Sequence, residues 1–236
     1  MQLRRGSGDH SCFIHAGTHK TGTTAIQRFL AGNRERLCAA GLYYPQTGVL
    51  SSQLPGHHNI AFELAGDPSF DRALGTLADV TQEIARVRPA DACMSSEVFQ
   101  YLHVNDAALV ALRDALAAIG YRGRIVLYVR AQDQYLESLY AELVKHGLQL
   151  PFADVLDLAM GRGVIRHGRV WTFRFDYTEL ANRFAAVFGS DAVIVRRYHD
   201  DGSAELLVHD FLAAVGSAPS LAADAGDEPA AYENMR

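Results

Sequence analysis

Apolar and polar residues follow one another along this chain in a pattern that predicts five short buried strands separated by helices. Unbroken apolar runs such as residues 124–129 are typical of strands covered on both faces. Strands are expected at 12–16, 42–44, 92–96, 124–129 and 192–196, and helices at 23–38, 58–65, 69–87, 105–119, 131–146, 152–160, 176–188 and 203–215. Strands that alternate with helices form parallel crossover units, so the pattern predicts a three-layer α/β domain with a central parallel sheet flanked by helices.

The turn after the first predicted strand contains residue types that bind oxyanions. Residues 14–24 read Ile-His-Ala-Gly-Thr-His-Lys-Thr-Gly-Thr-Thr, and a helix is expected from Thr23. The first N–H groups of a helix lack partners and carry partial positive charge, and glycines let the backbone approach a ligand closely. Lys20 adds a full positive charge. The other ligands expected in the turn are Thr21, Gly22, Thr23 and Thr24.

The end of the strand predicted at 124–129 offers a second anion ligand. Arg130 follows this strand directly, and Ser138 lies eight residues later in the helix expected at 131–146. A nucleotide kinase usually places a magnesium-binding aspartate at such a strand end. An arginine repels a metal ion, whereas its planar guanidinium can hold a phosphate through two hydrogen bonds. The sequence therefore favours a phosphate at this position.

The two motifs together resemble one known family. Gly17 and Gly22 have the spacing of a nucleoside-triphosphate loop, but Thr23 stands at the lysine position and the lysine lies at residue 20. This arrangement resembles the loop [Pro/His]-Lys-x-Gly-Thr-Thr of the sulfotransferases that use 3′-phosphoadenosine 5′-phosphosulfate (PAPS). The same family holds the 3′-phosphate with an arginine at a strand end and a serine eight residues later, a relation that Arg130 and Ser138 match.

The resemblance covers about residues 12–216 and implies a P-loop nucleotide-hydrolase-like sulfotransferase fold. It implies PAPS as the sulfate donor, no required metal ion, and transfer of the sulfuryl group to a hydroxyl of a glycan, lipid or small metabolite. It also implies that Lys20 takes part in catalysis as well as in cofactor binding. One feature of the family is missing, because no late glycine-rich Arg-Lys-Gly segment closes the nucleotide site.

The general base has two candidates in the sequence. Glu97 ends the run Ala-Cys-Met-Ser-Ser-Glu, where a buried strand opens into a polar tip, and a carboxylate there can accept a proton from the acceptor. His57 and His58 are the rivals, because a neutral imidazole is a natural base near pH 7. His58 is preferred of the two, since Ile60 and Phe62 indicate that the helix turns towards the core there.

Composition and charge narrow the classes of protein. The 236 residues are 49% hydrophobic and 21% charged, and the formal net charge of −5 argues against broad nucleic-acid binding. No apolar run has the length of a membrane span, so a cytoplasmic enzyme is expected. We expect a single domain over 12–216, with flexible tails at 1–11 and 217–236, and a basic loop at 161–169.

Two alternative functions remain open from the sequence. A divergent P-loop kinase or other nucleoside-triphosphate enzyme would need magnesium, and Glu97 is the acid at a strand end that could serve it. A degenerate nucleotide-binding module would keep the loop but lack turnover. Acceptor pockets are built from variable loops, so the sequence does not identify the acceptor.

Overall fold

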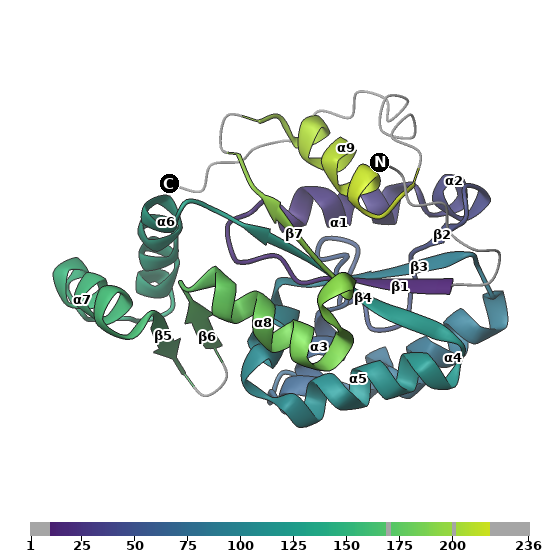
Figure 1. Ribbon diagram of the computed structural model, residues 1–236, viewed down its shortest axis with the longest axis horizontal. Coiled ribbons are helices and arrows are strands. Elements are labelled where there is room, and N and C mark those ends of the chain that lie inside the picture. Colours follow the sequence, from purple (N-terminus) through teal and green to yellow (C-terminus); the bar gives the residue numbers. More distant parts are fainter. Residues whose placement is uncertain (1–9, 169–170, 200–201, 218–236) are drawn as a thin grey trace.

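A computed structural model describes residues 10–168, 171–199 and 202–217, and its centre is a five-stranded parallel sheet. The strand order is β2–β3–β1–β4–β7, so the strand that leads into the glycine-rich turn is central. The strands are β1 (His10–His15), β2 (Leu42–Tyr43), β3 (Asp91–Ser95), β4 (Tyr121–Val129) and β7 (Val193–Arg197). Helices lie on both faces of this sheet (Figure 1), which confirms the predicted three-layer α/β architecture.

Each face of the sheet has its own layer of helices and its own part of the core. Phe13 and Val126 pack on one face with Leu30 and Phe211. Residues next to them along the strands, such as Ile14, pack on the other face. Side chains alternate along a strand, and here both sides are buried, which explains the unbroken apolar runs. The first face is covered by α1 (Thr23–Gly32), α2 (Arg34–Ala39) and α9 (Ala204–Ala214), and the second by α3 (His58–Ala65), α4 (Leu77–Val87), α5 (Asp106–Ala118) and α8 (Tyr177–Phe188).

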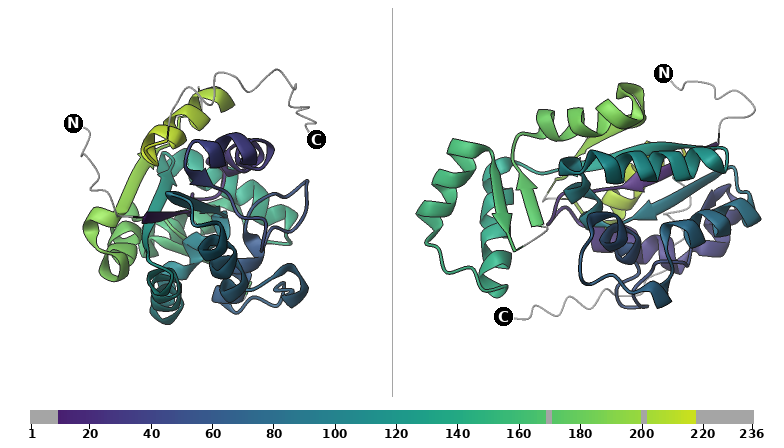
Figure 2. Two further views of the ribbon diagram at one scale, coloured as in Figure 1. Left: turned by 90° about the vertical axis from the view of Figure 1, so that its right-hand side faces the viewer. Right: turned by 90° about the horizontal axis from the view of Figure 1, so that it is seen from below.

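A smaller group of elements projects from the end of the sheet at which β4 terminates (Figure 2). Its members are α6 (Gln132–Lys145), α7 (Phe152–Arg162), β5 (Val164–His167) and β6 (Trp171–Arg174). The strands β5 and β6 pair in antiparallel fashion. The prediction of a loop at 161–169 is therefore wrong for its described part, because residues 164–167 form a strand that pairs with the next strand in the chain. Arg169, at the end of that expected loop, lies outside the described residues.

Two predicted helices are shorter than expected, and each break has a local cause. The helix expected at 23–38 ends at Gly32 and restarts as α2, because the side chain of Asn33 bonds to the carbonyl of Phe29. The helix expected at 69–87 begins at Leu77, after a single turn of 3-10 helix, η1 (Arg72–Leu74). Gly75 takes a φ of +96° there, and Thr76 caps the new helix.

Two further 3-10 helices were not anticipated: η2 (Glu97–Val104), directly after β3, and η3 (Ser190–Ala192), directly before β7. The domain limits at 12 and 216 stay a prediction, since residues 1–9 and 218–236, which make up most of the two expected tails, lie outside the described residues.

Candidate active site

The glycine-rich turn joins β1 to α1 at the carboxyl end of the sheet. Lys20 and Gly22 both have positive φ angles, of 62° and 72°. Glycine adopts such a backbone freely, whereas at Lys20 it is an uncommon and strained conformation. A Cβ on Gly22 would lie 2.4 Å from Cδ2 of Leu207, so a side chain at this position would also have to displace Leu207. Because α1 begins without a side-chain cap, its first N–H groups are available to an anion.

The three threonines of the turn occupy different environments. The hydroxyl of Thr21 is buried and donates to the carbonyl oxygen of Thr18 at 2.5 Å. The hydroxyl oxygen of Thr23 is covered and faces Gly17 on the inner side of the turn. Thr24 is exposed. In this conformation Thr24 presents its side chain to solvent, while the hydroxyl of Thr21 holds the turn from within.

Lys20 is in contact with a residue that sequence reasoning did not select. Its ammonium lies 2.8 Å from Oε2 of Glu142 on α6. This hydrogen bond, with the positive charge behind it, holds the pKa of the Glu142 carboxyl below its usual value. The other carboxylate oxygen lies 3.4 Å from Nε2 of His146. Glu142 is four residues after Ser138 on the same helical face, and this spacing was the signal available in the sequence.

The predicted pair of Arg130 and Ser138 is formed and adjoins the turn. The Arg130 guanidinium donates to Oγ of Ser138 at 2.7 Å and reaches the carbonyl oxygen of Lys20 at 3.5 Å. It also lies 5.8 Å from the ring centroid of Tyr198, within cation–π range. The strand end, the α6 face and the glycine-rich turn thus meet at one point.

The two candidate bases lie together rather than apart. Glu97 opens η2 beyond β3, and its Oε2 accepts a hydrogen bond from Nε2 of Gln27 at 3.3 Å. The same oxygen lies 3.9 Å from Nδ1 of His58, which contacts Oγ of Ser96 at 2.8 Å. Burial alone would raise the pKa of the Glu97 carboxyl. The rings of His58 and His19 and the Gln27 amide outweigh this effect and leave that pKa below its usual value, so the carboxylate is ionised at neutral pH.

His57 has a structural environment instead. Its ring is fully buried, with Nδ1 accepting from the N–H of Ser95 at 3.2 Å and Nε2 lying 3.1 Å from the carbonyl oxygen of Pro45. Burial lowers the pKa of His57 to about 3. Both ring nitrogens of His57 are therefore committed to the backbone, and the choice of His58 over His57 stays a prediction.

An aromatic group that sequence reasoning missed lies beside the turn. His19 is hydrogen bonded to the hydroxyl of Tyr101 on η2. Its ring centroid lies 5.3 Å from that of Phe173 and 6.5 Å from that of Trp171, both on β6. Burial lowers the pKa of His19 to about 4, and the Glu97 charge opposes this shift. The hairpin of β5 and β6 thus brings aromatic side chains to the edge of the glycine-rich turn.

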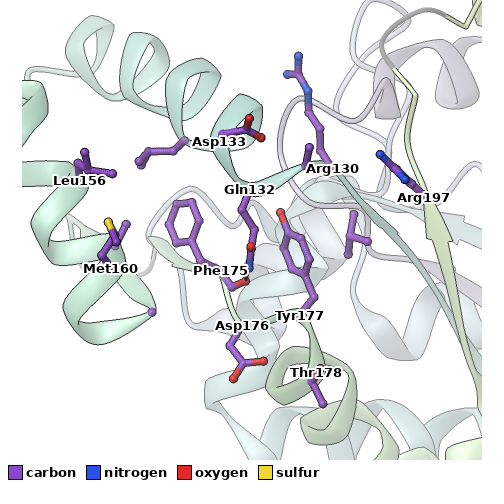
Figure 3. A pocket seen from close by; sticks show the side chains of 15 residues that line it. Arg130, Gln132, Asp133, Leu156, Met160, Phe175, Asp176, Tyr177, Thr178 and Arg197 are labelled. Atoms are coloured by element: carbon purple, nitrogen blue, oxygen red, sulfur yellow. Dashed lines mark hydrogen bonds between the residues drawn. The ribbon is translucent and has the colours of Figure 1, made fainter.

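A cleft of about 870 Å³ lies on the other side of the start of α6. Gln132, Asp133 and Leu136 line it, whereas Ser138 and Glu142 face the glycine-rich turn. Figure 3 shows that the Arg130 side chain extends away from the Phe175 and Tyr177 rings that line the cleft. Arg130 also lines the cleft, so this one residue borders both the cleft and the glycine-rich turn.

No three histidine, cysteine or acidic side chains are grouped so that they could hold a metal ion, within residues 10–168, 171–199 and 202–217. In the same part of the chain, each helix is too short or too polar to cross a membrane.

The arrangement of strands and helices matches known structures. It is similar to a sulfotransferase from Alicyclobacillus acidocaldarius, with a TM-score of 0.51 and 18% sequence identity over 88% of this chain and 81% of that one. The chain has the sulfotransferase fold. A sulfotransferase domain from the Synechococcus PCC 7002 olefin synthase is also similar, with a TM-score of 0.45 and 14% identity over 97% of this chain and 84% of that one. No protein-family model matches the sequence, and no curated protein matches it.

Within this sulfotransferase fold, three predicted site residues come from three neighbouring strands. Lys20, Glu97 and Arg130 follow β1, β3 and β4, which are adjacent in the sheet. Ligands of open parallel sheets bind beyond the carboxyl ends of the strands, which is where these residues lie. Gln27 and Glu142, by contrast, contact the site from within the helices α1 and α6.

Proposed function

We propose that the protein is a PAPS-dependent sulfotransferase, which transfers a sulfuryl group to a hydroxyl of a glycan, lipid or small metabolite. The observation that carries the proposal is the position of Arg130, which contacts Ser138 of α6 and the backbone of Lys20 at once. One guanidinium therefore borders both the glycine-rich turn and a serine eight residues further on. The sulfotransferase fold supports the same assignment.

The residues of the site suit an in-line displacement at sulfur. The acceptor oxygen would bond to sulfur as the bond from sulfur to the nucleotide phosphate breaks, and the leaving phosphate would keep the electron pair. Lys20 and the first N–H groups of α1 would stabilise that growing negative charge. Glu97, which is ionised and accepts a hydrogen bond from Gln27, would accept the hydroxyl proton. Arg130 and Ser138 would hold the 3′-phosphate.

The test is a calorimetric titration of the full chain with 3′-phosphoadenosine 5′-phosphate (PAP), compared with ATP and magnesium. We expect metal-independent binding of PAP that falls at least tenfold in Lys20→Ala and in Arg130→Ala, since each removes a charge-assisted contact worth about 1.5–3 kcal/mol. Lys145→Ala is the matched control. It removes an exposed cation from the end of α6, away from the Arg130 contacts.

The other outcomes of this titration identify the rival functions. Preference for ATP with magnesium would reject the sulfotransferase proposal and favour a kinase with Glu97 at the metal. Binding of neither nucleotide would reject it in favour of a degenerate module. If PAP binds, a screen of hydroxyl-bearing acceptors with PAPS follows, and PAP binding without transfer to any of them would again favour a module without turnover. The cytoplasmic location and the absence of nucleic-acid partners stay predictions from composition.

A further inference from the structure

The inner side of the glycine-rich turn contains a buried polar cluster that the proposed chemistry does not use. Gly17 has no side chain, and a Cβ built there would lie 3.1 Å from Nε2 of His15, 3.1 Å from Oγ1 of Thr23 and 3.0 Å from Oγ1 of Thr21. Three polar atoms thus converge on the face of Gly17 that a side chain would occupy. His15 and Thr21 are fully buried, and Thr23 is 7% exposed.

Two of these atoms lack a hydrogen-bond partner. Thr21 already donates to a backbone carbonyl, but Nε2 of His15 and Oγ1 of Thr23 have no partner in the described part of the chain. Buried polar groups in folded proteins are almost always paired, and an unpaired one is costly. Both atoms lie 3.1 Å from the same point beside Gly17, so the two unpaired groups border the same small space.

The opposite nitrogen of the imidazole connects this cluster to the strand before Glu97. Nδ1 of His15 lies 2.8 Å from Oγ of Ser95, and both residues are fully buried. The next residue, Ser96, makes the same contact with His58 at 2.8 Å. Consecutive side chains of an extended segment point to opposite faces, so the two serines contact two different histidines.

The ring of His15 can only act as a neutral hydrogen-bonding group. Burial lowers the pKa of His15 to about 4, so at neutral pH one nitrogen carries a hydrogen and the other accepts. A neutral imidazole can therefore link a serine on one side to a threonine on the other. It cannot supply a charge to an anion held in the turn.

We propose that His15 is a positioning residue of the sulfate-donor site, which links Ser95 to the hydroxyl of Thr23 and so fixes the first turn of α1. This inference rests on the proposed function, because it gives the fixed turn the task of holding the 5′-phosphosulfate. Thr23 is the first residue of α1, and an anion in the turn is bound by the N–H groups of that same helical turn. Donors that are fixed in advance need no reorganisation when the ligand binds.

The first test reads the contact itself, in the ligand-free protein. Nitrogen-15 NMR of the histidine ring nitrogens would compare the wild type with Thr23→Val, which keeps the shape of the side chain and removes the hydroxyl. We expect the Nε2 signal of His15 to move in the variant, while the ring signals of His57 stay in place. An unchanged Nε2 signal would overturn the proposal. Since no nucleotide is present, this result does not depend on the proposed function.

The second test measures the effect on the donor site through PAP affinity. Ser95→Ala and Ser96→Ala compare neighbouring serines that each contact one histidine at the same distance, and Ser96 in addition accepts from the N–H of Val98. We expect Ser95→Ala to weaken PAP binding about threefold to tenfold, the size expected from one lost hydrogen bond, and Ser96→Ala to leave PAP affinity within about twofold of the wild type. Equal affinities in the two variants would overturn the proposal.

Substitution of the histidine distinguishes positioning from simple packing. His15→Phe should weaken PAP binding by a similar factor, and His15→Gln, which keeps a hydrogen-bonding group, should recover part of the loss. If His15→Gln recovers none of the lost PAP affinity, and PAP affinity follows the stability of the variants alone, the proposal is wrong. If His15→Phe does not fold, Ser95→Ala and Thr23→Val still decide it. Failure of the wild type to bind PAP would reject the proposed function, with the NMR comparison unaffected.

Discussion

Glu142 offers the sharpest test of the electrostatics of the site, because its carboxylate forms an ion pair with Lys20, the lysine that the sulfate donor would need. The ammonium of Lys20 lies 2.8 Å from this carboxylate, and the two side chains are 41% and 27% exposed. An anion that enters the turn must either share Lys20 with Glu142 or displace it. We therefore predict that Glu142→Gln binds PAP more tightly than the wild type.

The size of the effect follows from the exposure of the pair. A partly exposed ion pair contributes about 0.2–1 kcal/mol after screening by solvent. The wild type loses this amount from its binding free energy when the ligand breaks the pair, whereas Glu142→Gln has no such pair to break. Removing a like charge beside a phosphate adds a term of about the same size. The two terms sum to about 0.4–2 kcal/mol, which is an affinity gain of roughly twofold to thirtyfold. The gain should shrink as salt is raised, because the screening length falls to about 8 Å at physiological ionic strength.

Calorimetric titration with PAP at low and at moderate salt measures this gain, and Glu137→Gln is the matched control. Glu137 lies on the same helix and is exposed, and it makes no hydrogen bond or ion pair within the described residues. Its substitution changes the net charge by the same amount without releasing Lys20. If Glu142→Gln binds PAP no more tightly than Glu137→Gln, then Glu142 orients Lys20 for the ligand and does not compete with it.

Three further predictions concern stability, pH and catalysis. Gly22→Ala should lower the free energy of unfolding in urea by about 1–3 kcal/mol more than Gly66→Ala, because both have φ near +70° but only the first would place a Cβ against Leu207; equal losses would contradict this. The pKa of buried His57 is lowered from 6.5 to about 3, so below pH 6.5 the unfolded chain binds a proton that the folded chain does not. Stability should therefore fall by about 1.4 kcal/mol per pH unit for this group as pH drops from 6.5 towards 4, measured by urea unfolding, and a His57→Phe variant should show a shallower decline. Glu97→Gln should lower kcat for sulfuryl transfer about 100-fold or more while PAP affinity changes less than about twofold, and a large loss of PAP affinity would mean that the residue binds the donor.

The layers of the fold and the glycine-rich turn could be predicted because they depend on local sequence. An unbroken apolar run such as residues 124–129 specifies a strand buried on both faces, whatever packs on it. Gly22 and the residues around it specify a tight turn because the backbone angles there suit glycine. Arg130 and Ser138 are separated by one short connection, so the sequence alone placed them near each other.

The tertiary structure decided which distant side chains complete the site. Lys20 meets Glu142, and Glu97 meets Gln27 and His58, across separations of 39 to 122 residues that no local pattern records. The strand at 164–167 was missed for a related reason, since four residues with mixed character form a strand only when a partner such as β6 satisfies their backbone. Local periodicity determines what a segment can become. The contacts made across the carboxyl end of the sheet determine what it does there.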